Sequence, residues 1–100
     1  MIEGLEKMLA QGKDSAELRF GLGNAYLASG NTEQAIEHLQ SCLAQKPNYS
    51  AAWKLLAKAQ QATDQTEAAI ETYRQGIEVA QQQGDKQAEK EMQVFLKRLL

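Results

Sequence analysis

The segment from Arg19 to Tyr26, RFGLGNAY, decides the fold, because a related segment, WKLLAKAQ, follows 34 residues later at residues 53–60. The same shift of 34 residues aligns Ile2 with Ile36 and Ile70. Leucine and alanine positions on either side of these isoleucines agree at the same offset. A fixed period of this length is typical of architectures in which similar units stack on one another.

Within each unit the apolar residues recur every three to four positions, which is the spacing of one face of an α-helix. Gly30 separates two such helices, because glycine readily takes the left-handed conformation that ends a helix. Asn31 is then expected to cap the next helix, with Gln34 completing a capping box. Pro47 closes the unit, and Asn48 is expected to cap the helix that follows. Each unit is therefore predicted to be a helical hairpin.

These features resemble those of a tetratricopeptide repeat protein, whose pattern is W-x₂-L-G-x₂-Y, then A-x₃-F, then P. The first full unit reads Arg19-x₂-Leu22-Gly23-x₂-Tyr26, then Ala35-x₃-Leu39, then Pro47. The second reads Trp53-x₂-Leu56-Ala57-x₂-Gln60, then Ala69-x₃-Tyr73, with Gln81 in place of the proline. Small residues stand where helices would cross closely, among them Gly23, Cys42 and Gly76. The resemblance implies an all-α fold, a right-handed superhelical stack of antiparallel helix hairpins.

The chain is expected to form one domain of six helices. We divide it into a half-repeat helix (1–15), repeat one (16–49), repeat two (50–83) and a C-terminal capping helix (84–100). The helices are predicted over Ile2–Gln11, Ala16–Ser29, Thr32–Gln45, Tyr49–Thr63, Thr66–Gln83 and Asp85–Leu100. Gly84 should end the fifth helix and Asp85 should cap the sixth. In the sixth helix, Phe95 belongs to the apolar face, and Glu91 belongs to the charged faces that keep the end of the stack solvated.

Composition excludes several classes of protein. The formal net charge of −2 argues against a nucleic-acid binder, which would normally carry a basic excess. A single cysteine excludes an internal disulfide and a cysteine-rich zinc site. The N-terminal residues do not form a signal peptide, and no apolar run approaches the roughly 18 residues of a membrane span. We therefore expect a cytoplasmic protein without membrane or nucleic-acid partners.

Few side chains suggest catalysis. Cys42 and His38 lie four residues apart on one helix face, but a nucleophilic cysteine needs a lowered thiol pKa. Because Gly76 occupies the position of Cys42 in the next unit, we interpret Cys42 as a small buried side chain. A lone histidine without converging carboxylates does not bind a metal. The sequence predicts a protein that is not an enzyme and has no metal or cofactor.

The resemblance implies a binding surface instead, because the first helix of each hairpin lines the concave side of such stacks, where extended peptides lie. The helix face opposite the packed stripe supplies the candidate residues. In the first hairpin they are Glu17, Phe20, Asn24, Leu27 and Ala28, and in the second Ala51, Lys54, Lys58 and Gln61.

Phe20 has two interpretations. It is either an exposed aromatic anchor for a partner or a core residue packed against Leu5 or Leu9. Lys54 and Lys58, beside Asn24, favour an acidic partner segment or a free C-terminal carboxylate, unless these lysines are merely solvated.

The clamp that binds chaperone tails in one subfamily of these repeats is not expected. Only Asn24 matches that pattern, because Phe20 replaces a lysine and Leu55 replaces an asparagine. The leading hypothesis is a protein-interaction module that binds a peptide or partner helix in its groove. The alternative is a structural subunit that forms a weak homodimer or larger assembly through its terminal helices, since the first predicted helix has no mate.

Overall fold

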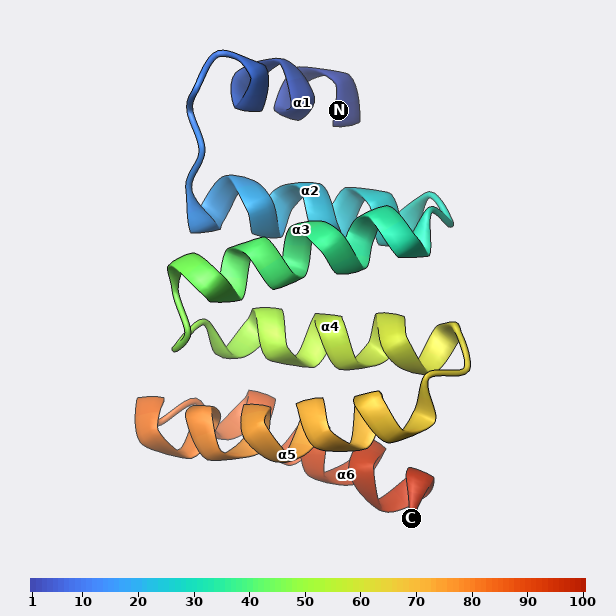
Figure 1. Cartoon of the computed structure of the whole chain (residues 1–100). Coiled ribbons are helices and arrows are strands. Elements are labelled where there is room, and N and C mark those ends of the chain that lie inside the picture. The colour runs from blue at the N-terminus through green and yellow to red at the C-terminus, as the bar shows by residue number, and fades with distance from the viewer.

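The computed structural model describes all 100 residues, and they form six α-helices and no strand (Figure 1). The helices are α1 (Ile2–Ala10), α2 (Ala16–Ala28), α3 (Thr32–Gln45), α4 (Ser50–Ala62), α5 (Thr66–Gln83) and α6 (Lys86–Leu99). Each predicted helix is present, and each boundary lies within one residue of the prediction. The all-α stack of helix hairpins is thereby confirmed.

The helices follow one another in chain order from α1 at one end of the molecule to α6 at the other (Figure 1). The molecule is elongated as a result, with extents of 41 × 28 × 18 Å. α2 packs on α3 and α4 packs on α5, while α4 also contacts both α2 and α6. The first helices of successive hairpins therefore form a row, α2–α4–α6. The division into a half-repeat, two repeats and a capping helix remains our proposal.

The core consists of two layers of buried side chains that meet at Trp53, which packs against both. The first layer lies among α2, α3 and α4 and is built from Ala16, Leu39, Cys42, Leu43, Ala52 and Leu56. The second lies among α4, α5 and α6 and is built from Ala57, Ala69, Tyr73, Ala80, Ala88 and Met92. No residue of α1 is fully buried, so the stack is least well packed at its first helix.

Two glycines allow helices to cross closely, as predicted. A Cβ atom on Gly23 would lie 2.6 Å from Leu39 Cγ, and a Cβ atom on Gly76 would lie 2.6 Å from Met92 Sδ. Such distances are far below van der Waals contact, so no larger residue fits without displacing a neighbour. Cys42, at the position equivalent to Gly76, is completely buried as expected.

The second unit departs from the repeat pattern at Gln60, and the structure provides a partner for this polar side chain. Gln60 is buried in α4, and its Oε1 atom lies 2.6 Å from the hydroxyl of Thr72 in α5. The same hydroxyl lies 2.8 Å from the carbonyl oxygen of Ala68. A buried amide oxygen must be hydrogen-bonded to be tolerated. Thr72 thus permits glutamine where an aromatic is usual.

The helix ends follow the prediction in part. Gly30 and Gly84, with φ values of 85° and 70°, take the left-handed backbone conformation expected where a helix ends. Asp85 caps α6 by accepting a hydrogen bond from the Ala88 amide. The capping box at Asn31 is wrong, because this side chain donates to the Ser29 hydroxyl instead. The cap at Asn48 is also wrong.

The turn that closes the first hairpin explains that second error. The Tyr49 amide donates to the Lys46 carbonyl, so the chain turns back and places Tyr49 directly before α4. The sequence pattern alone did not reveal this turn.

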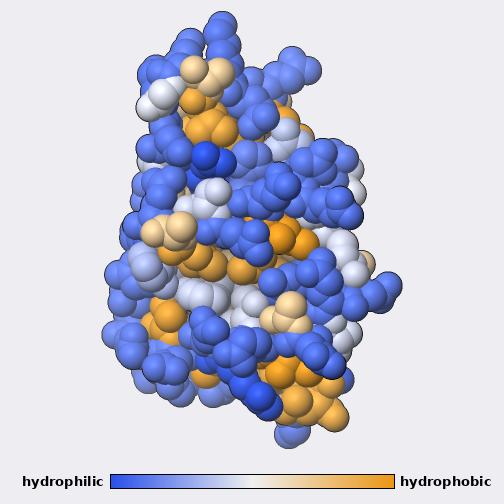
Figure 2. Space-filling model, in the orientation of Figure 1, coloured by the Kyte–Doolittle hydropathy of each residue, from blue (hydrophilic) through white to orange (hydrophobic).

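The surface in the view of Figure 2 is mainly hydrophilic, with hydrophobic side chains at the upper end of the stack, in a band across its middle and at its lower end. The large hydrophobic side chains with the greatest exposure are Met1, Met8, Val94 and Leu100. None of the helices combines the length and the apolar character that crossing a membrane requires.

Candidate functional site

The row α2–α4–α6 presents the predicted site residues, and its best-defined part is the contact between α4 and α6. Three side chains of α4, spaced four residues apart and so on one face of the helix, each contact a side chain of α6 or of Asp85, the residue that caps it. The pairs are Ser50 Oγ with Asp85 Oδ2 at 2.6 Å, Lys54 Nζ with Glu91 Oε1 at 2.9 Å, and Lys58 Nζ with the centre of the Phe95 ring at 5.3 Å. We call these three contacts the α4–α6 ladder.

The ladder changes the interpretation of the two predicted lysines. Lys54 is neither free in the groove nor merely solvated, because its ammonium group is paired with Glu91. The Glu91 side chain is 42% exposed, so it belongs to the charged surface of the last helix and also contacts α4. Lys58 is exposed and lies over the Phe95 ring, in a cation–π contact.

A hollow of about 380 Å³ lies at the end of the ladder. It is lined by Lys58, Gln61 and Ala62 of α4 and by Phe95 and Arg98 of α6. The guanidinium carbon of Arg98 lies 5.9 Å from the centre of the same Phe95 ring that Lys58 contacts. Two cationic side chains therefore share one aromatic ring, and no carboxylate lines the hollow.

Phe20, on α2, matches neither of its two interpretations completely. It is half-buried, and its ring stacks on Tyr49 with the ring centres 4.9 Å apart. Both rings pack against the first core layer. The sequence prediction placed Tyr49 inside the fourth helix and missed it as the neighbour, because Tyr49 lies directly before α4 and helical spacing does not reveal contacts between helices.

The other predicted residues of α2 differ in their surroundings. Glu17 forms an exposed ion pair with Lys46, at 3.6 Å. Asn24 is exposed, and its amide makes no hydrogen bond within the chain. Leu27 is half-buried. α2 thus contributes an aromatic ring, a free amide and an aliphatic side chain to the row α2–α4–α6.

Cys42 and His38 do not form an activated pair. Burial raises the pKa of the Cys42 thiol to about 11, which is opposite to what a nucleophile requires. The His38 ring stacks on Tyr26, and its Nδ1 atom accepts a hydrogen bond from Arg19. Because arginine only donates, the neutral His38 ring carries its proton on Nε2. Burial lowers the pKa of His38.

A polar network outside the groove fixes the connection between α1 and α2. Arg19 Nε and Nη2 donate to the two carboxylate oxygens of Asp14, each at 2.9 Å, and Gln45 donates to Oδ1. These hydrogen bonds, chiefly those from Arg19, lower the pKa of Asp14 to about 2. In the second unit, Trp53 stands in place of Arg19 and donates to the carbonyl oxygen of Pro47. Both side chains tie their helix to the connection before it.

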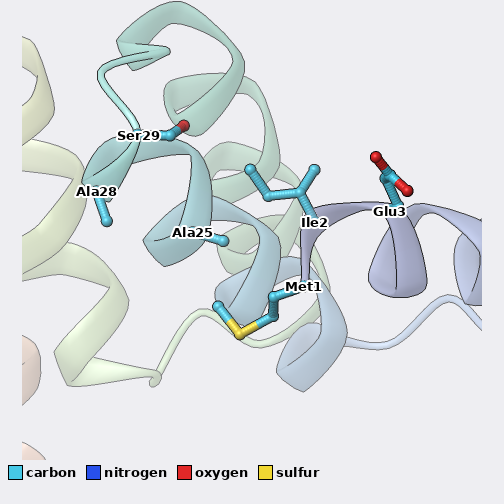
Figure 3. Close-up of a pocket in the computed structure, with 6 residues that line it drawn as sticks. All are labelled: Met1, Ile2, Glu3, Ala25, Ala28 and Ser29. Atoms are coloured by element: carbon cyan, nitrogen blue, oxygen red, sulfur yellow. The ribbon is translucent and has the colours of Figure 1, made fainter.

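A second hollow, of about 520 Å³, lies between the start of α1 and the end of α2 (Figure 3). Met1, directly before α1, and Ile2, its first residue, extend toward α2, whereas the carboxylate of Glu3 points away. This hollow is more apolar than the one at the end of the ladder. No group of three or more histidine, cysteine or acidic side chains is arranged to hold a metal ion.

Comparison with known proteins gives consistent matches along the chain. The family model described as tetratricopeptide repeat matches residues 2–41 and 27–90. The TPR repeat-containing protein PA0015 of Pseudomonas aeruginosa is 60% identical over 99 residues, a match that covers 99% of this chain and 94% of that protein.

Solved structures resemble the whole stack. The solution structure of protein BPP2914 from Bordetella parapertussis is 43% identical, has a TM-score of 0.87, and matches over 99% of this chain and 86% of its own. The TPR2B domain of yeast Sti1, solved in a complex with pHsp70, has a TM-score of 0.90 over 98% of this chain and 78% of its own. At 16% identity that second likeness shows the fold alone.

Proposed function

Because the chain belongs to the tetratricopeptide repeat family, whose fold is a protein-interaction module, we propose that it binds a peptide or partner helix in the groove formed by α2, α4 and α6. Proteins of this family are generally non-enzymatic scaffolds, and we propose the same for this chain. The raised pKa of Cys42 is consistent with that proposal.

The observation that carries the proposal is the composition of the groove. Its α2 part combines the half-buried Phe20 ring with the free amide of Asn24, and its α4–α6 part contains the hollow at Phe95. Aromatic side chains with nearby polar groups are the usual anchors of protein interfaces. The Sti1 domain of the same fold was solved in a complex with pHsp70, which agrees with use of this fold for binding.

The groove is short, so the affinity of a single site should be modest, in the micromolar range. Only three helices line it, and an extended peptide loses conformational entropy when it binds. Stronger binding would require several sites to act together.

The test is selection of peptides from a random display library against the intact chain, followed by binding measurements with variants. Phe20→Ala, Asn24→Ala and Lys58→Glu should each weaken the selected peptides. Glu37→Gln and Glu71→Gln, exposed on α3 and α5, serve as controls. If the selected peptides bind all groove variants as well as the original chain, the groove is not the binding surface.

We keep a second candidate, assembly of several copies, because one observation favours it. α1 has no fully buried residue, and Met8 on it and Met1 directly before it are 41% and 87% exposed. An apolar helix edge of this kind is suited to a contact between copies. Sedimentation of the purified chain over a range of concentrations tests this candidate, and a strict monomer throughout would eliminate it.

A further inference from the structure

We propose that the hollow at the end of the α4–α6 ladder binds a glutamate side chain of the partner, with Lys58 and Arg98 on the carboxylate and the Phe95 ring under the methylene groups. This inference rests on the proposed function, since it assumes a peptide in the groove. It adds that the groove selects peptides with a glutamate at this position. It assigns no binding role to Lys54, whose ammonium group is already paired with Glu91.

The charges around the groove single out Lys58 and Arg98. Lys46 pairs with Glu17, Lys54 pairs with Glu91, and Arg19 pairs with Asp14. Neither Lys58 nor Arg98 has a carboxylate within ion-pair distance, and both line the same hollow. The carbonyl ends of α4 and α6 lie close by, but a helix end is equivalent to only about half a unit charge. The two positive charges of Lys58 and Arg98 therefore outweigh the partial negative charges of the two helix ends, so the hollow favours an anionic ligand.

The apolar part of the hollow favours a side-chain carboxylate over a bare anion. Phe95 and Ala62 provide apolar surface, and Gln61 adds an amide that can donate a hydrogen bond. A glutamate has two methylene groups to cover the ring and a carboxylate that extends toward the two cations. Burying those methylene groups adds favourable free energy that a small inorganic anion does not gain.

The chain contains an internal example of this contact one helical turn away. Glu91 of α6 reaches Lys54 of α4 with 2.9 Å between the charged atoms, in the same space between the two helices. The side-chain lengths of lysine and glutamate thus fit this part of the groove. A partner glutamate at Lys58 would extend the ladder by one more contact.

The experiment uses three hexapeptides and the intact chain, with binding followed by NMR chemical shifts. The first is Ala-Leu-Glu-Glu-Leu-Ala, acetylated and amidated at its ends, and the second has glutamine in place of both glutamates. The third is the glutamine peptide with a free C-terminal carboxylate, which separates a side-chain acid from a chain end. We expect the glutamate peptide to bind most tightly and to shift the resonances of Lys58, Gln61 and Arg98.

Variants identify the charges that matter. Lys58→Gln and Arg98→Gln should each weaken the glutamate peptide about two- to fivefold, the range for a partly exposed ion pair. Lys90→Gln is the matched control, because Lys90 is an exposed cation of α6 that does not line the hollow. Raising the salt concentration should weaken the glutamate peptide and leave the glutamine peptide unchanged.

Several results would overturn the inference. Equal binding of the glutamate and glutamine peptides, or equal losses for Lys58→Gln and Lys90→Gln, would show that the hollow does not select a carboxylate. Tightest binding of the free-carboxylate peptide would assign the site to a chain end instead. In each of these cases the peptides still bind, so the proposed groove function survives. If the display-selected peptides bind all groove variants equally well, both the proposed groove function and the glutamate inference are wrong.

Discussion

Two glycines of α2, two positions apart, have different surroundings, and this difference gives a prediction at the scale of single residues. A Cβ atom on Gly23 would meet Leu39 at 2.6 Å, whereas a Cβ atom on Gly21 would lie 3.7 Å from Leu5, an ordinary contact. Gly23→Ala should therefore destabilise the fold by about 1–3 kcal/mol through overpacking. Gly21→Ala should stabilise it by about 0.5–1 kcal/mol, because alanine is the better helix former.

Urea denaturation of the two variants checks this pair of predictions. Each serves as the control for the other, since both change glycine to alanine in the same helix. A loss of stability in Gly21→Ala would mean that this position needs glycine for a reason that packing does not reveal.

Cys42 gives a second prediction at this scale. Its side chain is completely buried and the pKa of its thiol is raised to about 11, so at neutral pH almost no thiolate is present or accessible. A thiol reagent should modify the native chain far more slowly than the urea-unfolded chain. Reaction of the folded protein at the rate of the unfolded chain would contradict the burial of Cys42.

For the predicted site residues, the sequence indicated the helix face on which each one lies, but not the side chains that each one contacts. Leu27, Lys58 and Gln61 came from helical spacing, which fixes the side of a helix that a residue occupies. Spacing carries no information about contacts made across a gap between helices. The pairing of Lys54 with Glu91 depends on how α6 packs beside α4, and the stacking of Phe20 on Tyr49 depends on the turn before α4. Both were therefore missed.

At the scale of helix pairs, the buried contact between Gln60 and Thr72 joins α4 to α5. Thr72→Val keeps the shape of the side chain but leaves the Gln60 amide oxygen without its hydroxyl donor. This change should cost about 1–3 kcal/mol of stability, the usual penalty for an unsatisfied buried polar group. Thermal and urea denaturation measure the loss.

The double variant Gln60→Leu/Thr72→Val removes both polar groups and serves as the control. It should recover most of the loss, because replacing both partners by apolar groups is nearly neutral. Additive losses in the double variant would show that the contact between the two side chains contributes little.

The connection between α1 and α2 predicts a dependence of stability on pH. In the folded chain the pKa of Asp14 is lowered from 3.8 to about 2 by its hydrogen bonds, first of all from Arg19. The ionised Asp14 carboxylate therefore contributes its full stabilisation of the fold above its ordinary pKa of 3.8, and this contribution is lost as the pH falls through about 2. Asp14→Asn should remove this part of the acid destabilisation.

Urea denaturation of both proteins at a series of pH values down to 2 measures the effect. Asp64→Asn is the control, because Asp64 is exposed and forms no ion pair, and asparagine tolerates its positive φ of 60°. An identical pH profile for Asp14→Asn and the original chain would show that the Asp14 contacts do not form in solution.

At the scale of the whole molecule, burial predicts an uneven distribution of stability along the stack. α1 has no fully buried residue, whereas the completely buried Leu39, Tyr73 and Met92 lie in α3, α5 and α6. Backbone amides of α1 should therefore exchange with solvent deuterium fastest among the helices, through local opening of this end. Hydrogen exchange followed by NMR measures the rates, and exchange of α1 as slow as that of α4 would contradict the prediction.

The overall fold was predictable because a repeated sequence repeats its structure. The offset of 34 residues, the helical spacing and the glycines at residues 30 and 84 together determined six helices and their boundaries to within one residue. The cap at Asn31 failed because its side chain donates to the Ser29 hydroxyl, a competing local partner. The cap at Asn48 failed because the turn before α4 places Tyr49 at the helix start. Local choices of this kind depend on the exact path of the backbone.

Because the α4–α6 ladder lies in the groove, ligand binding there and the packing of α6 on α4 are thermodynamically coupled. A ligand that separates Lys54 from Glu91 destabilises the packing of α6 on α4, whereas a ligand that bridges Lys58 and Arg98 stabilises it. Fraying of the C-terminal helix, read from its own amide signals, would then report which kind of ligand has bound.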